Sequence, residues 1–279
     1  MPLLKRSGQP DLYYEIDDYT DPWKQAPYVL LQHSYAKSSR FYRSWVPYLS
    51  RFYKVLRPDL RGLGQSGKDF DLSKLNVACY LDDFNDLLDH LGVESLHYCG
   101  DMSAGILGLA YAAEYPQRVR TLSVVSTPVY MTEEDKKSAL CGYASRPEAL
   151  RKLGSRGWLE ASNAGRRFPA DTDPEMLAWT LDEMSKSDAE VLIAYFRWVS
   201  EGNAAPYLSR ITAPVLGLYP RGGVIIKDEH IELLRAHVRD LRIVKLPSNS
   251  QALHVSSPAA CALEVLHFIS QHDGIPCRE

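Results

Sequence analysis

Residues 95–110 read SLHYCGDMSAGILGLA, and this stretch decides the fold. A short strand-like run is followed by a tight turn from Gly100 to Gly105 and then by an Ala/Leu/Gly-rich run with helical spacing. Strand, turn and helix in this order are the setting of a nucleophile elbow, which lifts one side chain out of a sheet on a strained turn. The turn is too crowded for large flanking residues, so Gly100 and Ala104 place Met102 at its apex.

The residue at this apex conflicts with the usual chemistry of such a turn. Methionine has no ionisable proton and cannot be an acyl nucleophile. A turn shifted by one residue would put Asp101 at the apex, with Cys99 and Ser103 as the small flanking residues, but the helix phase argues against it. We therefore expect Met102 to contact a ligand, and Ser103 to act through its backbone N–H as a catalytic oxyanion donor.

Strands and helices alternate on both sides of this stretch. We predict strands at residues 12–16, 28–33, 53–58, 119–126, 214–219 and 242–246, and helices at 73–91, 229–238 and 258–271. This alternation predicts an α/β fold with a doubly wound, mostly parallel sheet. It lapses between 127 and 209, where the chain is helix-rich and interrupted by prolines. We expect a core domain of residues 1–127 and 210–279, with a helical cap of 128–209 inserted in it.

Composition narrows the class of protein. The chain has 279 residues, 45% of them apolar, and a formal net charge of −3. The lack of a long basic block argues against nucleic-acid or anionic-membrane partners, and no apolar run approaches the ~18 residues of a membrane span. Five scattered cysteines without C-x-x-C spacing predict reduced thiols in a cytoplasmic protein and no metal site. The expected partner is a small molecule, and a homodimer is compatible with the sequence.

Three further strings resemble one family over nearly the whole chain. They are LLQH at 30–33, RPDLRGLGQS at 57–66 and AEYPQRV at 113–119. Together with the elbow they resemble the α/β-hydrolase superfamily, and are most similar to its cap-bearing branch of enol-lactone and ester hydrolases. The resemblance implies a catalytic serine, an acid after the 214–219 strand and a histidine before the last helix.

The departures from that pattern fall on these three positions. Met102 stands in the serine position, Gly223 in the acid position and Gln251 in the histidine position. Some relatives carry the acid one strand earlier, where this chain has Ser126-Thr127. The resemblance therefore implies a degenerate triad, because all three proton-relay roles lack their side chains.

Backbone groups do not depend on these side chains. The oxyanion hole of this fold uses the N–H after the apex, here that of Ser103, and one from the loop near Ser34. We therefore expect a cofactor-free lyase, isomerase or decarboxylase acting on a small carbonyl or aromatic compound. One alternative is a residual ester, lactone or C–C hydrolase that uses water with His254 or His33. Another is a non-catalytic ligand-binding protein on the same scaffold.

Each of the remaining candidate site residues has both a functional and a purely structural interpretation. His254 could fill the vacated base position or be a buried histidine near the last helix. His33 could be catalytic or brace its loop. Tyr35 is placed to meet the ligand, whereas Lys37 and Arg40 are expected to face solvent.

In the cap, Trp158 is the candidate for ligand contact, although aromatic residues at helical spacing more often serve packing. Gln251 is expected to contact the ligand from the histidine position. Arg166 and Arg167 could clamp a carboxylate or form a solvated pair.

Overall fold

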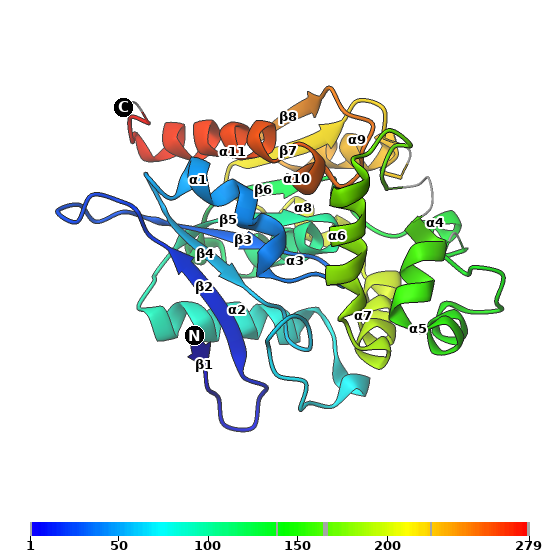
Figure 1. Cartoon of the computed structure of the whole chain (residues 1–279). Coiled ribbons are helices and arrows are strands. Elements are labelled where there is room, and N and C mark those ends of the chain that lie inside the picture. The colour runs from blue at the N-terminus through cyan, green and yellow to red at the C-terminus, as the bar shows by residue number, and fades with distance from the viewer. Residues whose placement is uncertain (1, 138, 164–166, 224, 278–279) are drawn as a thin grey trace.

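The computed structural model describes residues 2–137, 139–163, 167–223 and 225–277, and a twisted sheet lies at its centre (Figure 1). Within those ranges the strands are β1 (Leu3–Leu4), β2 (Leu12–Asp17), β3 (Tyr28–Gln32), β4 (Lys54–Pro58), β5 (Leu96–Asp101), β6 (Val119–Val125), β7 (Val215–Pro220) and β8 (Leu241–Leu246). Their order across the sheet is β1-β2-β4-β3-β5-β6-β7-β8. Only the pairs β1–β2 and β2–β4 are antiparallel. The predicted α/β class with a mostly parallel sheet is confirmed.

Helices cover both faces of the sheet. The helices of the core are α1 (Val46–Leu49), α2 (Val77–Leu91), α3 (Met102–Glu114), α8 (Ala205–Leu208), α9 (Asp228–His237), α10 (Leu253–Ser256) and α11 (Pro258–Asp273), with 3-10 turns η1 (Ser39–Trp45), η2 (Leu72–Lys74) and η3 (Pro116–Arg118). The predicted 73–91 helix begins later, at Val77, because the Asn76 side chain accepts the Cys79 N–H and caps it there. Gly92, in the left-handed conformation, ends it as expected.

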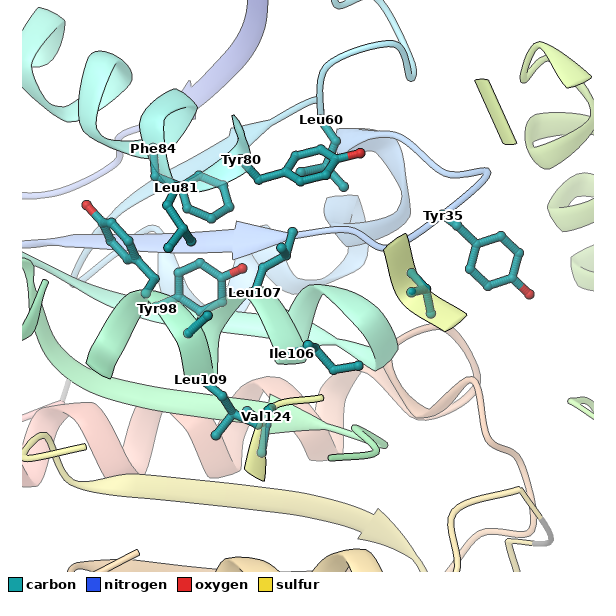
Figure 2. Close-up of a cluster of buried hydrophobic side chains, with 14 of the residues drawn as sticks. Tyr35, Leu60, Tyr80, Leu81, Phe84, Tyr98, Ile106, Leu107, Leu109 and Val124 are labelled. Atoms are coloured by element: carbon teal, nitrogen blue, oxygen red, sulfur yellow. The ribbon is translucent and has the colours of Figure 1, made fainter. Parts of the chain in front are cut away.

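The strands contribute alternate residues to two apolar clusters. On β3, Leu30 belongs to the cluster under α2, α3 and α9, whereas Val29 and Leu31 belong to the cluster under α1 and α11. This period of two is that of a strand buried on both faces. Figure 2 shows the first cluster, in which Phe84 of α2 and Leu107 of α3 pack near the sheet.

A helical insertion separates two neighbouring strands. Between β6 and β7 lie α4 (Glu133–Lys137), α5 (Arg146–Asn163), α6 (Pro174–Ser185) and α7 (Ala189–Glu201), which gather beside one edge of the core (Figure 1). Yet β6 and β7 pair directly, with Leu122 opposite Val215. The insertion therefore leaves the sheet intact and covers the end of the strands at which β5 passes into α3.

Candidate active site

The turn between β5 and α3 bends at Met102. Met102 has a φ of +48°, a left-handed value that is rare for a side chain of this size, whereas Asp101 is extended with a φ of −95°. A Cβ on Gly100 would lie 2.8 Å from the Ala104 backbone, which explains the glycine at position 100. The alternative turn with Asp101 at its apex is therefore wrong.

Met102 faces a cavity between the core and the cap. This elbow pocket, of about 80 Å³, is lined by Tyr35, Met102, Ser103 and Ile106 from the core and by Trp158 and Phe196 from the cap, among others. Its surface is mostly apolar, with Arg146 and Arg167 as cationic members. Four residues predicted to form the site thus share one cavity, namely Tyr35, Met102, Ser103 and Trp158. Their contact with a ligand stays a prediction.

The cap side of the elbow pocket is a packed aromatic wall. Trp158 is fully buried, donates its indole N–H to the Ala139 carbonyl at 3.0 Å and stacks edge-on against Phe196. The guanidinium of Arg167 lies over the Tyr35 ring, 4.7 Å from its centre. Burial lowers the pKa of Arg167 to about 10, so it remains a cation at neutral pH. Arg166 lies outside the described residues.

The positions implied for the acid and the histidine meet in space. A Cβ on Gly223 would lie 2.0 Å from Nε2 of Gln251, so these two positions are in direct contact although they follow different strands. Gln251 is buried, and its backbone N–H donates to the Arg167 carbonyl at 3.0 Å. The earlier acid position, Ser126, is also buried and carries a φ of +47°. None of these three positions supplies a titratable side chain.

Ser34 and Ser103, the two predicted oxyanion donors, differ in their surroundings. Ser103 lies in the first turn of α3, where backbone N–H groups lack helical partners, and its Oγ lies 3.0 Å from the hydroxyl of Tyr195. Ser34 instead donates its N–H and its Oγ–H to the Asp101 carboxylate, at 3.2 and 2.8 Å. Ser34 is completely buried and does not line the elbow pocket. The structure thus gives the Ser34 N–H a carboxylate partner in place of the expected ligand.

Asp101 is the centre of a buried polar cluster directly beneath the elbow. Lys37 approaches its Oδ2 to 2.5 Å, and the Tyr42 hydroxyl donates to its Oδ1 at 3.3 Å. Burial by itself would raise the pKa of Asp101, but His254, Lys37 and the Ser34 hydrogen bond together hold it well below its usual range. Asp101 is therefore ionised at neutral pH. The expectation that Lys37 faces solvent is wrong, because it is 9% exposed, whereas Arg40 is exposed as predicted.

His254 lies beside this cluster. Its Nε2 is 3.8 Å from Oδ2 of Asp101, and its ring packs near those of Tyr42 and Phe41. Burial, reinforced by the charge on Lys37, lowers the pKa of His254 to about 3, so the imidazole is neutral at physiological pH. His254 follows Gln251 by only three residues, yet its ring approaches the carboxylate of Asp101, the residue directly before the bend.

His33 joins two backbone segments. Its Nδ1–H donates to the Ser34 carbonyl at 2.8 Å, and its Nε2 accepts the Leu60 N–H at 3.0 Å. Both ring nitrogens of this fully buried residue are thus engaged, and burial lowers its pKa. The geometry favours a brace between the β3 and β4 loops over proton transfer.

A second, smaller cavity adjoins the elbow pocket. This side pocket, of about 20 Å³, shares Tyr35, Met102 and Arg167 with the elbow pocket. Its other walls include Lys37, Phe41, Thr180, Met184, Gln251 and His254. Met102 therefore borders two cavities, one lined by the cap aromatics and the other by His254.

Two features missed from sequence belong to this site. They are the Lys37–Asp101 pair and the contact of Tyr195 with Ser103. The only sequence signal for the pair was the position of Asp101 directly before the apex. Among the described residues, no group of histidine, cysteine and carboxylate side chains has the arrangement of a metal site, and no helix is long and apolar enough to cross a membrane.

Comparisons with known proteins bear on the fold and the family of this chain. A putative carbamate hydrolase, RutD, from Azorhizobium caulinodans is 32% identical over 43% of this chain and 42% of its own length. A cis-3-alkyl-4-alkyloxetan-2-one decarboxylase from Shewanella oneidensis is 29% identical over 70% of this chain and 57% of its own, so the chain spans about half the length of each. The solved enol-lactonase of Burkholderia xenovorans superposes with a TM-score of 0.85 at 21% identity, over 96% of this chain and all of that one.

A family model described as the alpha/beta hydrolase fold matches residues 27–185, which include the elbow, the β3 and β4 loops and part of the cap. That match covers more than half of the chain. The protein therefore belongs to the α/β-hydrolase fold family.

Proposed function

We propose that this protein is an enzyme that acts on a small carbonyl or aromatic compound in the elbow pocket without forming a serine acyl-enzyme. The observation that carries the proposal is the backbone of Met102. A left-handed φ at the bend puts methionine in the position from which this fold presents its nucleophile. Strain of that kind persists where the surroundings maintain it, as they do at functional sites.

The reaction class follows from what remains around Met102. The first turn of α3 offers backbone N–H groups and the positive end of a 13-residue helix. Such donors stabilise a developing oxyanion or enolate without themselves reacting. Decarboxylation of a β-keto acid passes through such a species and needs neither an attacking side chain nor a base. C–C cleavage and isomerisation also pass through it but need a base to take a proton, and the candidate for that role is His254 beside Asp101. We therefore propose a cofactor-independent lyase, isomerase or decarboxylase.

The surroundings of the pocket support a small, largely apolar substrate. Trp158, Phe196 and Ile106 supply apolar walls. The charged members of the lining are Arg146 over the Phe196 ring, Arg167 over the Tyr35 ring and the carboxylate of Asp135. The name of the Shewanella oneidensis relative states a decarboxylase of an oxetanone, a strained cyclic ester. We therefore propose β-keto acids and β-lactones as the first substrates to test for decarboxylation, and enol lactones as the test for hydrolysis by the second candidate below.

The decisive experiment compares chemistry with and without a serine at the bend. The wild-type protein is treated with a fluorophosphonate, which labels activated serines, and is assayed by NMR against the proposed substrates. We expect turnover without labelling. The triple variant Met102→Ser, Gly223→Asp, Gln251→His is the positive control for labelling, whereas Met102→Ser alone should gain neither label nor esterase activity. A label on Ser103 of the wild type would overturn the proposal.

One observation favours a second candidate, a hydrolase that uses water directly. His254 and the ionised Asp101 lie 3.8 Å apart next to Met102, and a carboxylate beside an imidazole is a common general-base arrangement. The low pKa of His254 makes it a weak base. Hydrolysis of aryl esters by the wild type that His254→Gln abolishes would favour this candidate. Substrate binding without any turnover would leave a ligand-binding role.

A further inference from the structure

The hydroxyls of Ser103 and Tyr195 form a buried pair beside the elbow pocket. Their oxygens lie 3.0 Å apart, and either hydroxyl can be the donor. Ser103 is 5% exposed and Tyr195 is completely buried. Among the described residues, neither hydroxyl has a second hydrogen-bond partner. Each hydroxyl carries one proton, and a single bond uses only one of the two. The other proton therefore needs an acceptor from outside the pair.

The surroundings of Tyr195 decide which proton is left over. Its ring lies among those of Tyr80, Phe196 and Trp198, with centres 6.0, 6.4 and 4.9 Å away, and Tyr195 does not line the elbow pocket. A buried O–H that donates to nothing loses its hydration without replacement. Tyr195 therefore donates to Oγ of Ser103. Burial also raises the pKa of Tyr195, so it keeps its proton and cannot act as a base toward Ser103.

The left-over proton belongs to Ser103, whose side chain lies on the pocket face of α3. Ser103 and Ile106 are three residues apart in this helix and so share one of its faces. Both line the elbow pocket, and so does Phe196, the neighbour of Tyr195 in α7. The elbow pocket is thus the cavity from which an acceptor can reach the Ser103 hydroxyl.

We propose that the Ser103 hydroxyl, with Tyr195 donating to it, is a side-chain hydrogen-bond donor to the carbonyl or enolate oxygen of a ligand in the elbow pocket. The inference rests on the proposed function, because it takes the ligand to be a carbonyl compound. The Ser103 hydroxyl keeps its proton throughout, so no covalent step is involved. It supplies a second donor beside the Ser103 N–H, whereas the Ser34 N–H is engaged by the Asp101 carboxylate.

This arrangement favours an anionic oxygen over a neutral one. Hydrogen bonds to an ionised acceptor are roughly twice as strong as those between neutral groups. The bond that Ser103 accepts from Tyr195 polarises its own O–H and strengthens the bond that it donates. The ligand class is therefore a small compound whose oxygen carries charge on a planar carbon, such as an enolate or a phenolate. Ser103 contacts the ligand, and Tyr195 is a positioning residue.

Binding of 4-nitrophenolate tests the donor without requiring turnover. Its dissociation constant is measured by calorimetry at a pH at which the phenol is ionised. Ser103→Ala should weaken binding about 10- to 100-fold, because a charge-assisted hydrogen bond is lost. Ser103→Thr keeps the hydroxyl and should retain most of the affinity. Ser162→Ala is the matched control, because Ser162 lines the same pocket but donates its hydroxyl proton to the Leu159 carbonyl at 3.5 Å.

A double-mutant cycle tests the role of Tyr195. Tyr195→Phe keeps the packed ring and removes the bond to Ser103, so it should weaken phenolate binding roughly two- to fourfold. In a chain that already carries Ser103→Ala, the same change should have no effect on binding. An equal effect in both backgrounds would show that Tyr195 acts through packing alone and would contradict its positioning role.

The inference and the proposed function can fail separately in these experiments. A wild-type protein that does not bind the phenolate, or a Ser103→Ala protein that binds it as tightly as the wild type, overturns the inference even if substrates are turned over. Binding that depends on Ser103 in a protein that turns over none of the proposed substrates supports the inference and overturns the proposed function.

Discussion

Replacing Lys37 by methionine tests the buried charge pair beneath the elbow. Methionine keeps most of the apolar stem of lysine and removes only the ammonium group. The Asp101 carboxylate would then remain fully buried with Ser34 and Tyr42 as its hydrogen-bond donors. The substitution therefore removes the ammonium with its 2.5 Å contact to Oδ2 of Asp101, its hydrogen bond to Ser34 Oγ at 3.1 Å and its position 5.8 Å from the centre of the Phe41 ring.

The expected loss of stability in Lys37→Met follows from the burial of the Lys37–Asp101 pair. Side-chain exposure is 8% for Lys37 and 0% for Asp101, so solvent screens the pair very little. Breaking a buried pair by removing one partner costs about 3–5 kcal/mol, because an uncompensated charge stays inside. Total stabilities are about 5–15 kcal/mol, so the variant should lose a large part of its stability. The double variant Lys37→Met, Asp101→Asn removes the stranded charge and should recover more than half of the loss.

The pH dependence of the variant has a definite sign. In the wild type the pKa of Asp101 lies below its unfolded value, so its contribution is present above that value and is lost as acid protonates the folded form. In Lys37→Met, burial is no longer opposed by the ammonium, and the folded pKa rises. The folded state then binds the proton more readily, so the penalty is greatest at neutral pH and shrinks on acidification.

Urea unfolding followed by circular dichroism at pH 7 and pH 5 measures these quantities. The exposed Lys74, whose nitrogen lies 3.6 Å from Asp71, supplies the control Lys74→Met, which should leave the midpoint unchanged. A loss below about 1 kcal/mol for Lys37→Met, or a penalty that grows at pH 5, would refute the reasoning.

Three further variants address the remaining elements of the site. The pKa of His254, about 3 in the folded protein, lies below its ordinary 6.5, so on acidification the unfolded chain takes up this proton first. The free energy of unfolding therefore falls as the pH drops below about 6.5. His254→Gln should make that fall shallower in acid titrations followed by fluorescence. Gly223→Ala should cost about 1–3 kcal/mol by urea unfolding, because its Cβ would lie 2.0 Å from Gln251 Nε2 and 2.4 Å from Pro220 Cγ. Gln251→Ala in the same chain should relieve only the part of this cost that is due to Gln251. Equal costs with and without the second change would contradict the contact with Gln251. His33→Ala should lower the free energy of unfolding by about 1–3 kcal/mol, because it leaves the buried Leu60 N–H unpaired. A His33→Ala protein that loses activity at unchanged stability would instead assign His33 to catalysis.

The sequence by itself determined the fold and the position of the bend. The apolar run at residues 28–33 and the helix ending at Gly92 depend on local periodicity and capping, which the chain carries within a few residues. The bend at Met102 was equally local, because the backbone of Ala104 leaves no room for a Cβ at position 100. The meeting of Gly223 with Gln251 was implied by resemblance to a family whose loops converge at this edge of the sheet.

Only the tertiary structure decided what surrounds the bend. Lys37 reaches Asp101 across 64 residues of chain, and Ser103 meets Tyr195 across 92. A polar loop residue such as Lys37 gives no local sign of burial, since its fate depends on which carboxylate the folded chain places opposite it. Local sequence likewise carries no sign that the Ser34 N–H lies against the Asp101 carboxylate, so the expectation was that it faces a ligand. Hydrogen bonds and charge pairs are set by distances of a few ångströms between distant segments, and sequence spacing carries no such information.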